Sequence, residues 1–314
     1  MFESASLPTR GLDFIGDIHG QQEKLLQLLQ ALNYQAAGSS FRHPDGRRIV
    51  FVGDYVDRGP HVREVLQIVR GLVESGQAIA LAGNHEYNML CYHTPDGAGG
   101  WLRKHSEKNT HQIAATLRAF AGRDEEWRDW LAWFRTLPCY LDLGACRAVH
   151  ACWDSRQIPL LPPGILGDAD FLQASAKRGS PEFIAIETVL KGVEMPLPEG
   201  LTFRDKEGIE RKKTRVRWWK LAGKLTLGEI IMPPGSMENS TLVDEGALQP
   251  LPHYPADAPP VFFGHYWLSP DSPKAPLAPN LACLDYSAGL GGDLVAYRWD
   301  GEAVLSAEKF VAVR

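Results

Sequence analysis

Five short apolar runs in this chain each stop at residues that belong in water or on a metal ion. The runs are FIGDIHG, FVGDYVDRG, LAGNHE, AVHAC and FFGHYW. A short apolar run that ends in a turn residue is typical of a buried strand. Aspartate and histidine at the end of such a strand are costly to bury unless they are paired or bind a metal. The pattern therefore requires a fold that brings several strand ends to a shared polar site.

The first half of the chain alternates strand patterns with helix patterns. LDFIGD, RIVFVGD and AIALAGN read as buried strands, and the amphipathic stretches QQEKLLQLLQALN and HVREVLQIVRGLVESG lie between them. This β-α-β-α-β order predicts a parallel sheet with right-handed crossovers, whose strand ends share one edge. Two further helices are expected within residues 107–120 and 125–137, and strands within 139–143 and 147–150.

The stretch Trp153–Pro259 differs from the rest in composition. It contains little strand pattern, several prolines and the basic and aromatic run RKKTRVRWWK. We interpret it as a helical and irregular insertion, packed like a cap over a single α/β domain of residues 1–314. Strands resume in PVFFGH, LACLDY and DLVAYRWDG.

The composition of the chain indicates a soluble globular protein. An apolar content of 44% and a charged content of 23% over 314 residues are those of a soluble globular protein. The net charge of −5 argues against a stable nucleic-acid partner. No apolar run has signal-peptide or membrane-spanning length, so we expect a cytoplasmic protein with no membrane partner. The five cysteines are scattered without a Cys-x-x-Cys pair, which indicates reduced, buried thiols.

The strand ends deliver side chains that suit metal ions. The candidate ligands are Asp17, His19, Asp54, Asn84, His150 and His265. Aspartate, histidine and asparagine without cysteine suit manganese, iron or zinc. A single Gly-Asp or Gly-His pair is usually a turn, but the whole set, each member after a predicted strand, indicates a metal site. Two cations about 4 Å apart need a shared anionic ligand and serve attack on phosphorus.

The motifs GDIHG, GDYVDRG, GNHE, VHA and GH resemble those of the calcineurin-like metallophosphoesterases, specifically the phosphoprotein phosphatase superfamily. The resemblance implies a central two-sheet β-sandwich flanked by helices, and two divalent ions with manganese favoured. It implies that Asp17, His19 and Asp54 hold one metal. Asp54 would bridge to the second metal, whose remaining ligands are Asn84, His150 and His265.

The same resemblance implies three further roles. His85 would donate a proton to the leaving oxygen, and Asp57 would hold its imidazole. Arg58 would bind the phosphoryl oxygens through its planar fork. The alternative for Asp57 and Arg58 is an ordinary surface ion pair.

The motifs divide between two branches of the superfamily. Serine/threonine phosphatases usually place arginine before Gly-Asn-His-Glu, where this chain has Ala82, and two glycines where it has Ala151 and Cys152. The segments TRVRWW, VFFGHYWL and LDYSAGLGGDLVAYRWDG are similar to those of bacterial symmetrical bis(5′-nucleosyl)-tetraphosphatases. Asp57 and Glu86 depart from that second pattern.

Arg215, Arg217 and Trp218 are candidates for substrate binding. The arginines would bind a distal phosphate while an indole stacks on a base. The alternative is a solvated basic face with its tryptophans packed inward.

These observations favour a two-metal phosphoesterase that acts on a phosphorylated small molecule, a nucleotide or a dinucleoside polyphosphate. A bacterial serine/threonine protein phosphatase acting on phosphoproteins is the first alternative. An inactive protein that binds phosphorylated partners or RNA through Arg211–Lys220 is the second. The presence of all six candidate ligands argues against the second alternative, because inactive relatives normally lose metal ligands.

Overall fold

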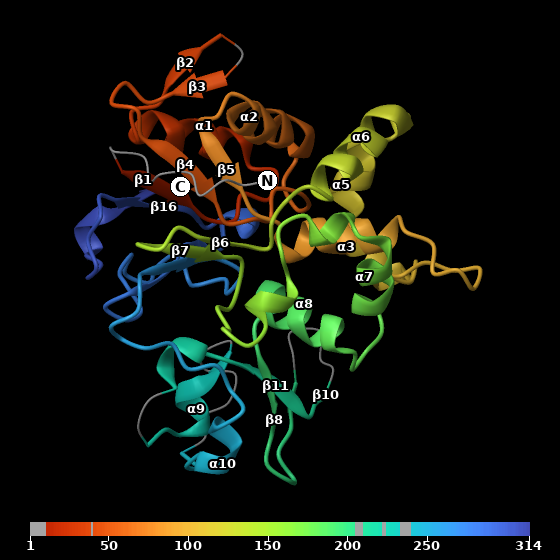
Figure 1. Cartoon of the computed structure of the whole chain (residues 1–314), viewed down its shortest axis with the longest axis vertical. Helices are drawn as coiled ribbons and strands as arrows, with labels where there is room; N and C mark the ends of the chain where they lie inside the picture. The colour runs from red at the N-terminus through yellow and green to blue at the C-terminus, as the bar shows by residue number, and fades with distance from the viewer. Residues whose placement is uncertain (1–10, 39, 205–209, 222–223, 233–239) are drawn as a thin grey trace.

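Two β-sheets face each other at the centre of the molecule (Figure 1). The structure is a computed structural model that describes residues 11–38, 40–204, 210–221, 224–232 and 240–314. The first sheet has the order β15-β16-β1-β4-β5, with β17 paired to β16. Its strands are β1 (Leu12–Ile15), β4 (Arg48–Phe51), β5 (Ala78–Ala80), β15 (Asp285–Tyr286), β16 (Asp293–Trp299) and β17 (Phe310–Val313). β1, β4 and β5 are parallel, as the sequence predicts, whereas β16 runs antiparallel to β1.

The second sheet has the order β14-β13-β7-β6. Its strands are β6 (Tyr140–Asp142), β7 (Arg147–Val149), β13 (Val261–Phe263) and β14 (Leu281–Cys283). β13 is parallel to both β7 and β14. The polar strand ends therefore come from two sheets, because β7 and β13 pair with each other and not with β1, β4 or β5. This confirms the central two-sheet sandwich that the family resemblance implies.

Helices cover the first sheet and the region beside the strand ends. α1 (Gln22–Ala31) packs on β16 and β17, and α2 (Val62–Glu74) packs on β5. α3 (Asn84–Tyr92) lies beside α6 (Asp124–Phe134). The helix expected within 107–120 is two short helices, α4 (Glu107–Gln112) and α5 (Ala114–Ala119). A small hairpin of β2 (Gln35–Ala37) and β3 (Ser40–Arg42) projects above α1 and α2 (Figure 1).

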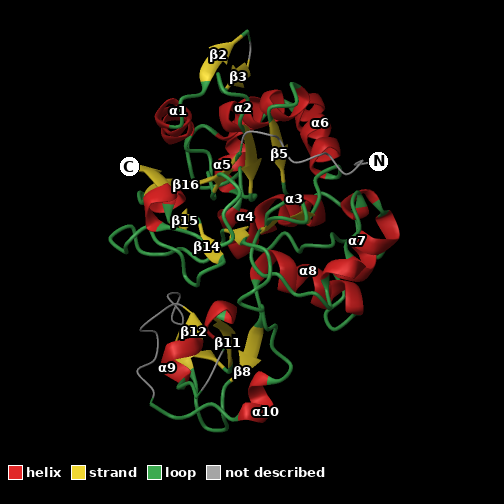
Figure 2. Ribbon diagram, turned by 60° about the vertical axis from the view of Figure 1, so that its left-hand side comes forward, coloured by secondary structure: helices red, strands yellow, loops and turns green. Residues whose placement is uncertain are grey.

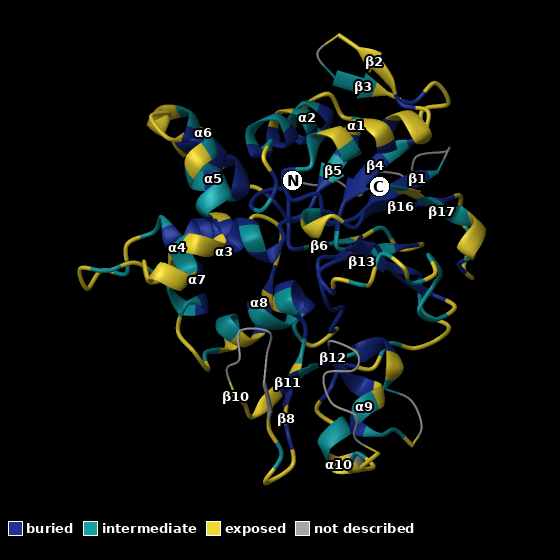
Figure 3. Cartoon of the chain, turned by 180° about the vertical axis from the view of Figure 1, so that it is seen from behind, coloured by how far each residue is buried: buried dark blue, intermediate teal, exposed yellow. Residues whose placement is uncertain are grey.

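The core has two principal parts. Between the sheets, Phe14 of β1 stacks on Phe262 of β13 with ring centroids 3.8 Å apart. Aliphatic side chains such as Val50 and Ala148 complete this inter-sheet layer. A larger cluster fills the space beneath the helices, and Figure 3 shows the sheet strands buried and the outer helix faces exposed. All five cysteines are buried and free, which confirms the prediction of reduced thiols.

The insertion contains more strand than the sequence indicates. Its first part holds helices α7 (Ala169–Ser175) and α8 (Pro181–Lys191). Its second part is a lobe below the two sheets (Figure 2), built on the sheet β12-β11-β8 with a small core of its own. The elements of this lobe are β8 (Glu194–Pro196), β9 (Phe203–Arg204), β10 (Glu210–Arg211), β11 (Lys213–Val216), α9 (Leu227–Ile230), β12 (Ile231–Met232) and α10 (Glu245–Leu248). Strands of two to four residues are too short to show a clear period-two pattern, which explains the incorrect expectation.

Short 3₁₀ turns complete the fold. They lie at Ile158–Leu160, Ile165–Gly167, Trp218–Lys220, Ala288–Leu290 and Ala307–Lys309. Among the described helices, none combines the length and the apolar character needed to cross a membrane. The expectation about a leader falls on residues 1–10, which lie outside the described residues.

We predict that Phe14→Ala strongly destabilises the fold. Removing a fully buried ring from the inter-sheet layer should cost about 3–5 kcal/mol of unfolding free energy. Urea unfolding followed by circular dichroism measures it. Val304→Ala is the control, since Val304 is 68% exposed and its loss should change stability by less than about 0.5 kcal/mol. Equal unfolding midpoints for the two variants would contradict this account of the core.

Candidate functional site

The turns that follow the strands hold several non-glycine residues in the left-handed backbone region. His19, Asp54, Asp57, Arg58 and His265 have φ values of 47°, 57°, 69°, 63° and 73°. Such conformations are uncommon for residues with a side chain, and they cluster at functional sites where the surroundings enforce them. Here they turn the side chains of both sheets toward one place.

Glycines in these motifs let carboxylates approach the backbone closely. A Cβ atom on Gly83 would lie 2.1 Å from Oδ1 of Asp54, and one on Gly264 would lie 1.9 Å from Oδ1 of Asp17. Both distances are far below a normal contact. Each glycine is therefore required by the carboxylate that lies against it.

Asp54 lies at the centre of the site. Its Oδ2 is 3.5 Å from Nε2 of His19, and its Oδ1 is 3.4 Å from Nε2 of His150. The peptide N–H of His85 donates to Oδ1 at 3.0 Å. Burial alone would raise the pKa of Asp54, but the neighbouring histidines His150 and His85 hold it well below its usual value.

Backbone carbonyls orient two of the histidines. Nδ1 of His19 donates to the carbonyl of Val56 at 2.8 Å, and Nδ1 of His150 donates to the carbonyl of Val52 at 2.9 Å. Both imidazoles therefore direct Nε2 toward Asp54, in the arrangement usual for histidine ligands of a metal. Nε2 of His19 is buried without a hydrogen-bond partner.

Asn84 and His265 form the other side of the site. Oδ1 of Asn84 lies 2.7 Å from Nδ1 of His265 and 3.1 Å from Nε2 of His150. Nε2 of His265 is buried and unpartnered. Asp17 accepts the peptide N–H of His265 at 3.1 Å. The structure thus gathers all six predicted ligands into one buried cluster.

The donor set fits divalent cations. Two groups of side chains could each hold a cation, because within each group the ligand atoms lie within 4.8 Å of one another. The first group is His19, Asp54 and His85, and the second is Asp54, His150 and His265. Asp54 belongs to both groups. Nε2 of His150 faces two oxygen acceptors, so a proton or a cation must lie between them. The charge and hydrogen bond of Asp54 outweigh burial and raise the pKa of His150 to about 10, which shows how strongly this position attracts positive charge.

A third carboxylate, Asp285, increases the negative charge of the site. Burial, and then the charge of Asp285, raise the pKa of Asp17 well above its ordinary value. Asp285 also accepts the peptide N–H groups of Trp267 and Ser287 at 2.8 and 2.9 Å. The sequence analysis does not name Asp285 as a site residue, although LACLDY is an apolar run that ends in aspartate, like FIGD and FVGD.

His85 is paired with a buried carboxylate. Its Nδ1 lies 2.6 Å from Oδ2 of Asp57, and Thr116 also hydrogen-bonds Asp57. Burial would lower the pKa of His85, but Asp54 and Asp57 together raise it. Because Asp57 is fully buried against His85, the alternative of a surface ion pair with Arg58 is wrong.

Arg58 carries its guanidinium beside the cluster. The guanidinium carbon lies 4.2 Å from the ring centroid of Trp267, and Nη1 is buried without a hydrogen-bond partner. Gly289 packs so closely that an added Cβ would meet Cβ of His19 and Cδ of Arg58 at 2.8 and 2.9 Å. A fixed guanidinium with an unsatisfied donor is ready to bind an anion.

The three residues predicted from TRVRWW to bind substrate, Arg215, Arg217 and Trp218, have different surroundings. Burial, and then the charge of Arg215, lower the pKa of His265 well below normal, so Arg215 lies near the cluster. Nε of Arg215 is buried and unpartnered. Arg217 instead donates to the carbonyl of Ile231 within the lobe.

Trp218 is a core residue and not a stacking platform. Its indole is 1% exposed, donates to the carbonyl of Ala151 at 3.0 Å, and packs against Phe263 with ring centroids 5.0 Å apart. The inward-packed alternative is therefore correct for this tryptophan. Its hydrogen bond fixes the lobe to the chain just after His150.

Glu86 is a second residue whose role the sequence did not reveal. Its carboxylate accepts the peptide N–H groups of Asp54, Tyr55 and Gly83 at 2.8–2.9 Å. Burial, and then the charge of Asp54, raise the pKa of Glu86 to about 7. The side chain therefore ties the turn after β4 to the start of α3. In the sequence, the only indication of this role is that Glu86 is the last residue of the GNHE motif.

Part of the chain is similar to known proteins. Residues 12–143 match the calcineurin-like phosphoesterase family. Bis(5′-nucleosyl)-tetraphosphatase PrpE [asymmetrical] of Halalkalibacterium halodurans is 45% identical over 80 residues, 26% of this chain and 32% of that protein. Its counterpart of the same name in Anoxybacillus flavithermus is 29% identical over 156 residues, 50% of this chain and 58% of that protein. Both carry the asymmetrical name, whereas the motifs of the second half are similar to symmetrical enzymes.

These matches cover only part of the relatives, since the chain spans about a third of the first and under two thirds of the second. A cold-active protein-tyrosine phosphatase of a psychrophilic Shewanella species superposes with a TM-score of 0.48 at 18% identity, over 97% of this chain and 80% of that one.

We predict that manganese stabilises the chain and that Asp54→Asn abolishes the effect. A ligand at 100 times its Kd adds about 2.7 kcal/mol to the native state, which should raise Tm by roughly 5 °C. Differential scanning fluorimetry with manganese and with EDTA measures the shift. Asp129→Asn is the control, since its carboxylate is 62% exposed on α6 and should leave the shift intact. An undiminished shift in Asp54→Asn would contradict a shared ligand at Asp54.

Proposed function

We propose that this chain, whose residues 12–143 match the calcineurin-like phosphoesterase family, is a metal-dependent hydrolase of phosphate esters or anhydrides. The observation that carries the proposal is the Asp54 carboxylate between the Nε2 atoms of His19 and His150. Asp17, His19 and Asp54 would hold one cation, and Asp54, Asn84, His150 and His265 would hold a second. Divalent cations at these positions would lower the pKa of a water molecule and polarise the phosphoryl group.

His85 serves as the proton donor to the leaving oxygen. Its Nδ1 is held by Asp57, so its Nε2 carries the transferable proton. The carboxylates of Asp54 and Asp57 raise the pKa of His85 against the effect of burial, which favours the protonated imidazole that a general acid requires. Asp57 positions the ring and stabilises its charge, and Thr116 holds Asp57 in turn.

Arg58 and Arg215 serve as the phosphate ligands. Each has a guanidinium N–H that is buried without a partner. Besides burial, the charge of Arg58 lowers the pKa of His19, and that of Arg215 lowers the pKa of His265. Arg58 lies on the turn after β4, and Arg215 lies on β11 of the lobe. Arg215 would therefore supply the second arginine that the chain lacks at Ala82.

Nucleotides and dinucleoside polyphosphates are the favoured substrates. Two observations support them: relatives named as tetraphosphatases match part of the chain, and Arg215 of the lobe has a buried, unpartnered Nε. A protein phosphatase is the alternative, and GDYVDRG and GNHE support it because they match the serine/threonine family at its defining positions.

We predict that Asp57→Asn moves the alkaline limb of the turnover profile to lower pH. A general acid is active below its pKa, so turnover falls as pH rises through the pKa of His85. Replacing Asp57 removes a charge and a hydrogen bond that raise this pKa. His85→Asn should lose roughly 10²–10⁴-fold in turnover at every pH while keeping its metal.

The measurement is kcat against pH for both variants, with Asp129→Asn as a charge-matched control that should follow the wild type. Metal content is measured in parallel on the purified proteins. Loss of metal from His85→Asn, or an unmoved alkaline limb in Asp57→Asn, would contradict the assignment of His85 as the acid.

A substrate panel tests the proposed function itself. Diadenosine tetraphosphate, ATP, a phosphoserine peptide and p-nitrophenyl phosphate are each incubated with manganese, and kcat/KM is compared. We expect the dinucleotide or the nucleotide to exceed the peptide. Strong peptide turnover without dinucleotide turnover would overturn the nucleotide preference. The products also locate the cleaved bond, because two ADP result from symmetrical hydrolysis and ATP with AMP from asymmetrical hydrolysis.

A further inference from the structure

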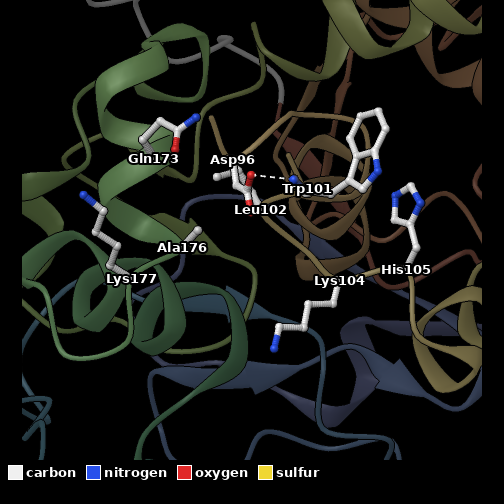
Figure 4. Close-up of a pocket in the computed structure, with 9 residues that line it drawn as sticks. Asp96, Trp101, Leu102, Lys104, His105, Gln173, Ala176 and Lys177 are labelled. Carbon is white, nitrogen blue, oxygen red and sulfur yellow. Dashed lines mark hydrogen bonds between the residues drawn. The ribbon is translucent and has the colours of Figure 1, made fainter. Parts of the chain in front are cut away.

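A pocket lies at the opposite end of α3 from the candidate metal ligands, between the loop after α3 and helix α7 (Figure 4). Its volume is about 450 Å³, which is within the range of small-molecule sites. Asn84 begins α3 and Tyr92 ends it, so a rise of 1.5 Å per residue separates the two ends by about 12 Å. None of the six metal ligands lines this pocket. It is therefore distinct from the site described above.

A stack of three aromatic rings forms one wall. Tyr92 stacks on His105 with centroids 3.7 Å apart and planes 15° apart, and His105 stacks on Trp101 at 4.7 Å and 10°. Two parallel rings cannot share one face of an imidazole, so His105 lies between the other two. Nε2 of His105 also lies 2.7 Å from the carbonyl oxygen of Tyr92, which fixes the stack.

Trp101 ends this stack and lines the pocket. In the view of Figure 4, His105 lies on one side of Trp101, and Gln173, Ala176 and Lys177 lie on the other. The indole is 39% exposed, and its backbone pairs with Pro95 in an isolated bridge. A rigid, exposed indole supported by two more rings is a platform on which a planar base can stack.

Hydrogen-bond acceptors face the space beside this platform. Oδ1 of Asp96 accepts the peptide N–H groups of Ala98 and Gly100, and the amide of Gln173 donates to the carbonyl of Pro95. Neither Oδ2 of Asp96 nor Oε1 of Gln173 receives a hydrogen bond from the described part of the chain. Both atoms can accept from the exocyclic amine of a purine.

Two lysines supply positive charge around the acceptors. Lys104 follows the platform along the loop, and Lys177 follows α7 on the opposite wall. Both side chains are exposed, so neither ammonium group has lost its hydration. Ammonium groups on both walls are suited to the phosphates of a ligand whose base stacks between them.

We propose that this pocket is a nucleotide-binding site, separate from the metal cluster, that stacks a purine base on Trp101 and pairs its phosphates with Lys104 and Lys177. The proposal does not depend on the hydrolase function, because the pocket uses no metal ligand. Binding should therefore persist when metals are removed.

Isothermal titration calorimetry of the full chain with ATP in EDTA tests the proposal, because EDTA prevents turnover and keeps the metal cluster empty. Tripolyphosphate is the probe without a base. We expect ATP to bind in EDTA and to bind more tightly than tripolyphosphate. Trp101→Ala should weaken ATP binding by roughly 5- to 150-fold, the range of base–aromatic stacking.

Lys104→Ala with Lys177→Ala provides a second variant whose exposed positions should not affect folding. It should weaken ATP binding by roughly 2- to 30-fold, as expected for two exposed ion pairs. Arg118→Ala is the control, since Arg118 is exposed on α5 outside the pocket and should leave the Kd unchanged. Circular dichroism checks that each variant is folded.

Three results would overturn the proposal. The first is no ATP binding by the wild type in EDTA, and the second is equal affinity for ATP and tripolyphosphate. The third is an unchanged ATP affinity in both the Trp101→Ala variant and the double lysine variant. Failure of the hydrolase proposal would instead appear as absent turnover with manganese while ATP binding in EDTA is intact.

Discussion

A carboxylate buried away from water must be compensated by positive charge or hydrogen bonds, and Asp54 imposes this requirement on the centre of the molecule. Both of its oxygens lie within 3.5 Å of histidine nitrogens, and a peptide N–H donates to one of them. Glu86 holds the peptide N–H of Asp54 itself, which fixes the carboxylate from behind. The left-handed turns and the glycines that lie against carboxylates allow these polar groups to come together around Asp54.

The packing of the two sheets brings the candidate metal ligands together. His19 and Asp54 follow strands of the first sheet, whereas His150 and His265 follow strands of the second. The stacked rings of Phe14 and Phe262 join the sheets between them. The hydrophobic core and the polar site therefore depend on each other, since a shift of one sheet would separate the ligands of the two halves.

Much of the site could be predicted because its residues stand next to apolar runs. Each strand end could be recognised locally, and the chemistry of Asp, His and Asn limited the ligands that they could bind. The roles of Glu86 and Asp285 were not assigned from the sequence. Each accepts a peptide N–H group from a distant segment, that of Asp54 for Glu86 and that of Trp267 for Asp285, and no local pattern shows such a contact. Trp218 was misassigned for a related reason: an aromatic residue beside arginines has the same local pattern whether it packs inward or faces a ligand.

The sequence alone determined the order of strands and helices in the first half, the six candidate ligands and the buried thiols, since these depend on local periodicity and residue chemistry. Tertiary structure decided which strands belong to which of the two sheets, that Arg217 donates to a carbonyl within the lobe, and that Trp101 stacks on His105 beyond the end of α3. Those outcomes depend on contacts between segments distant in the chain. Such contacts are set by the packing of whole layers, and no local stretch of sequence encodes them.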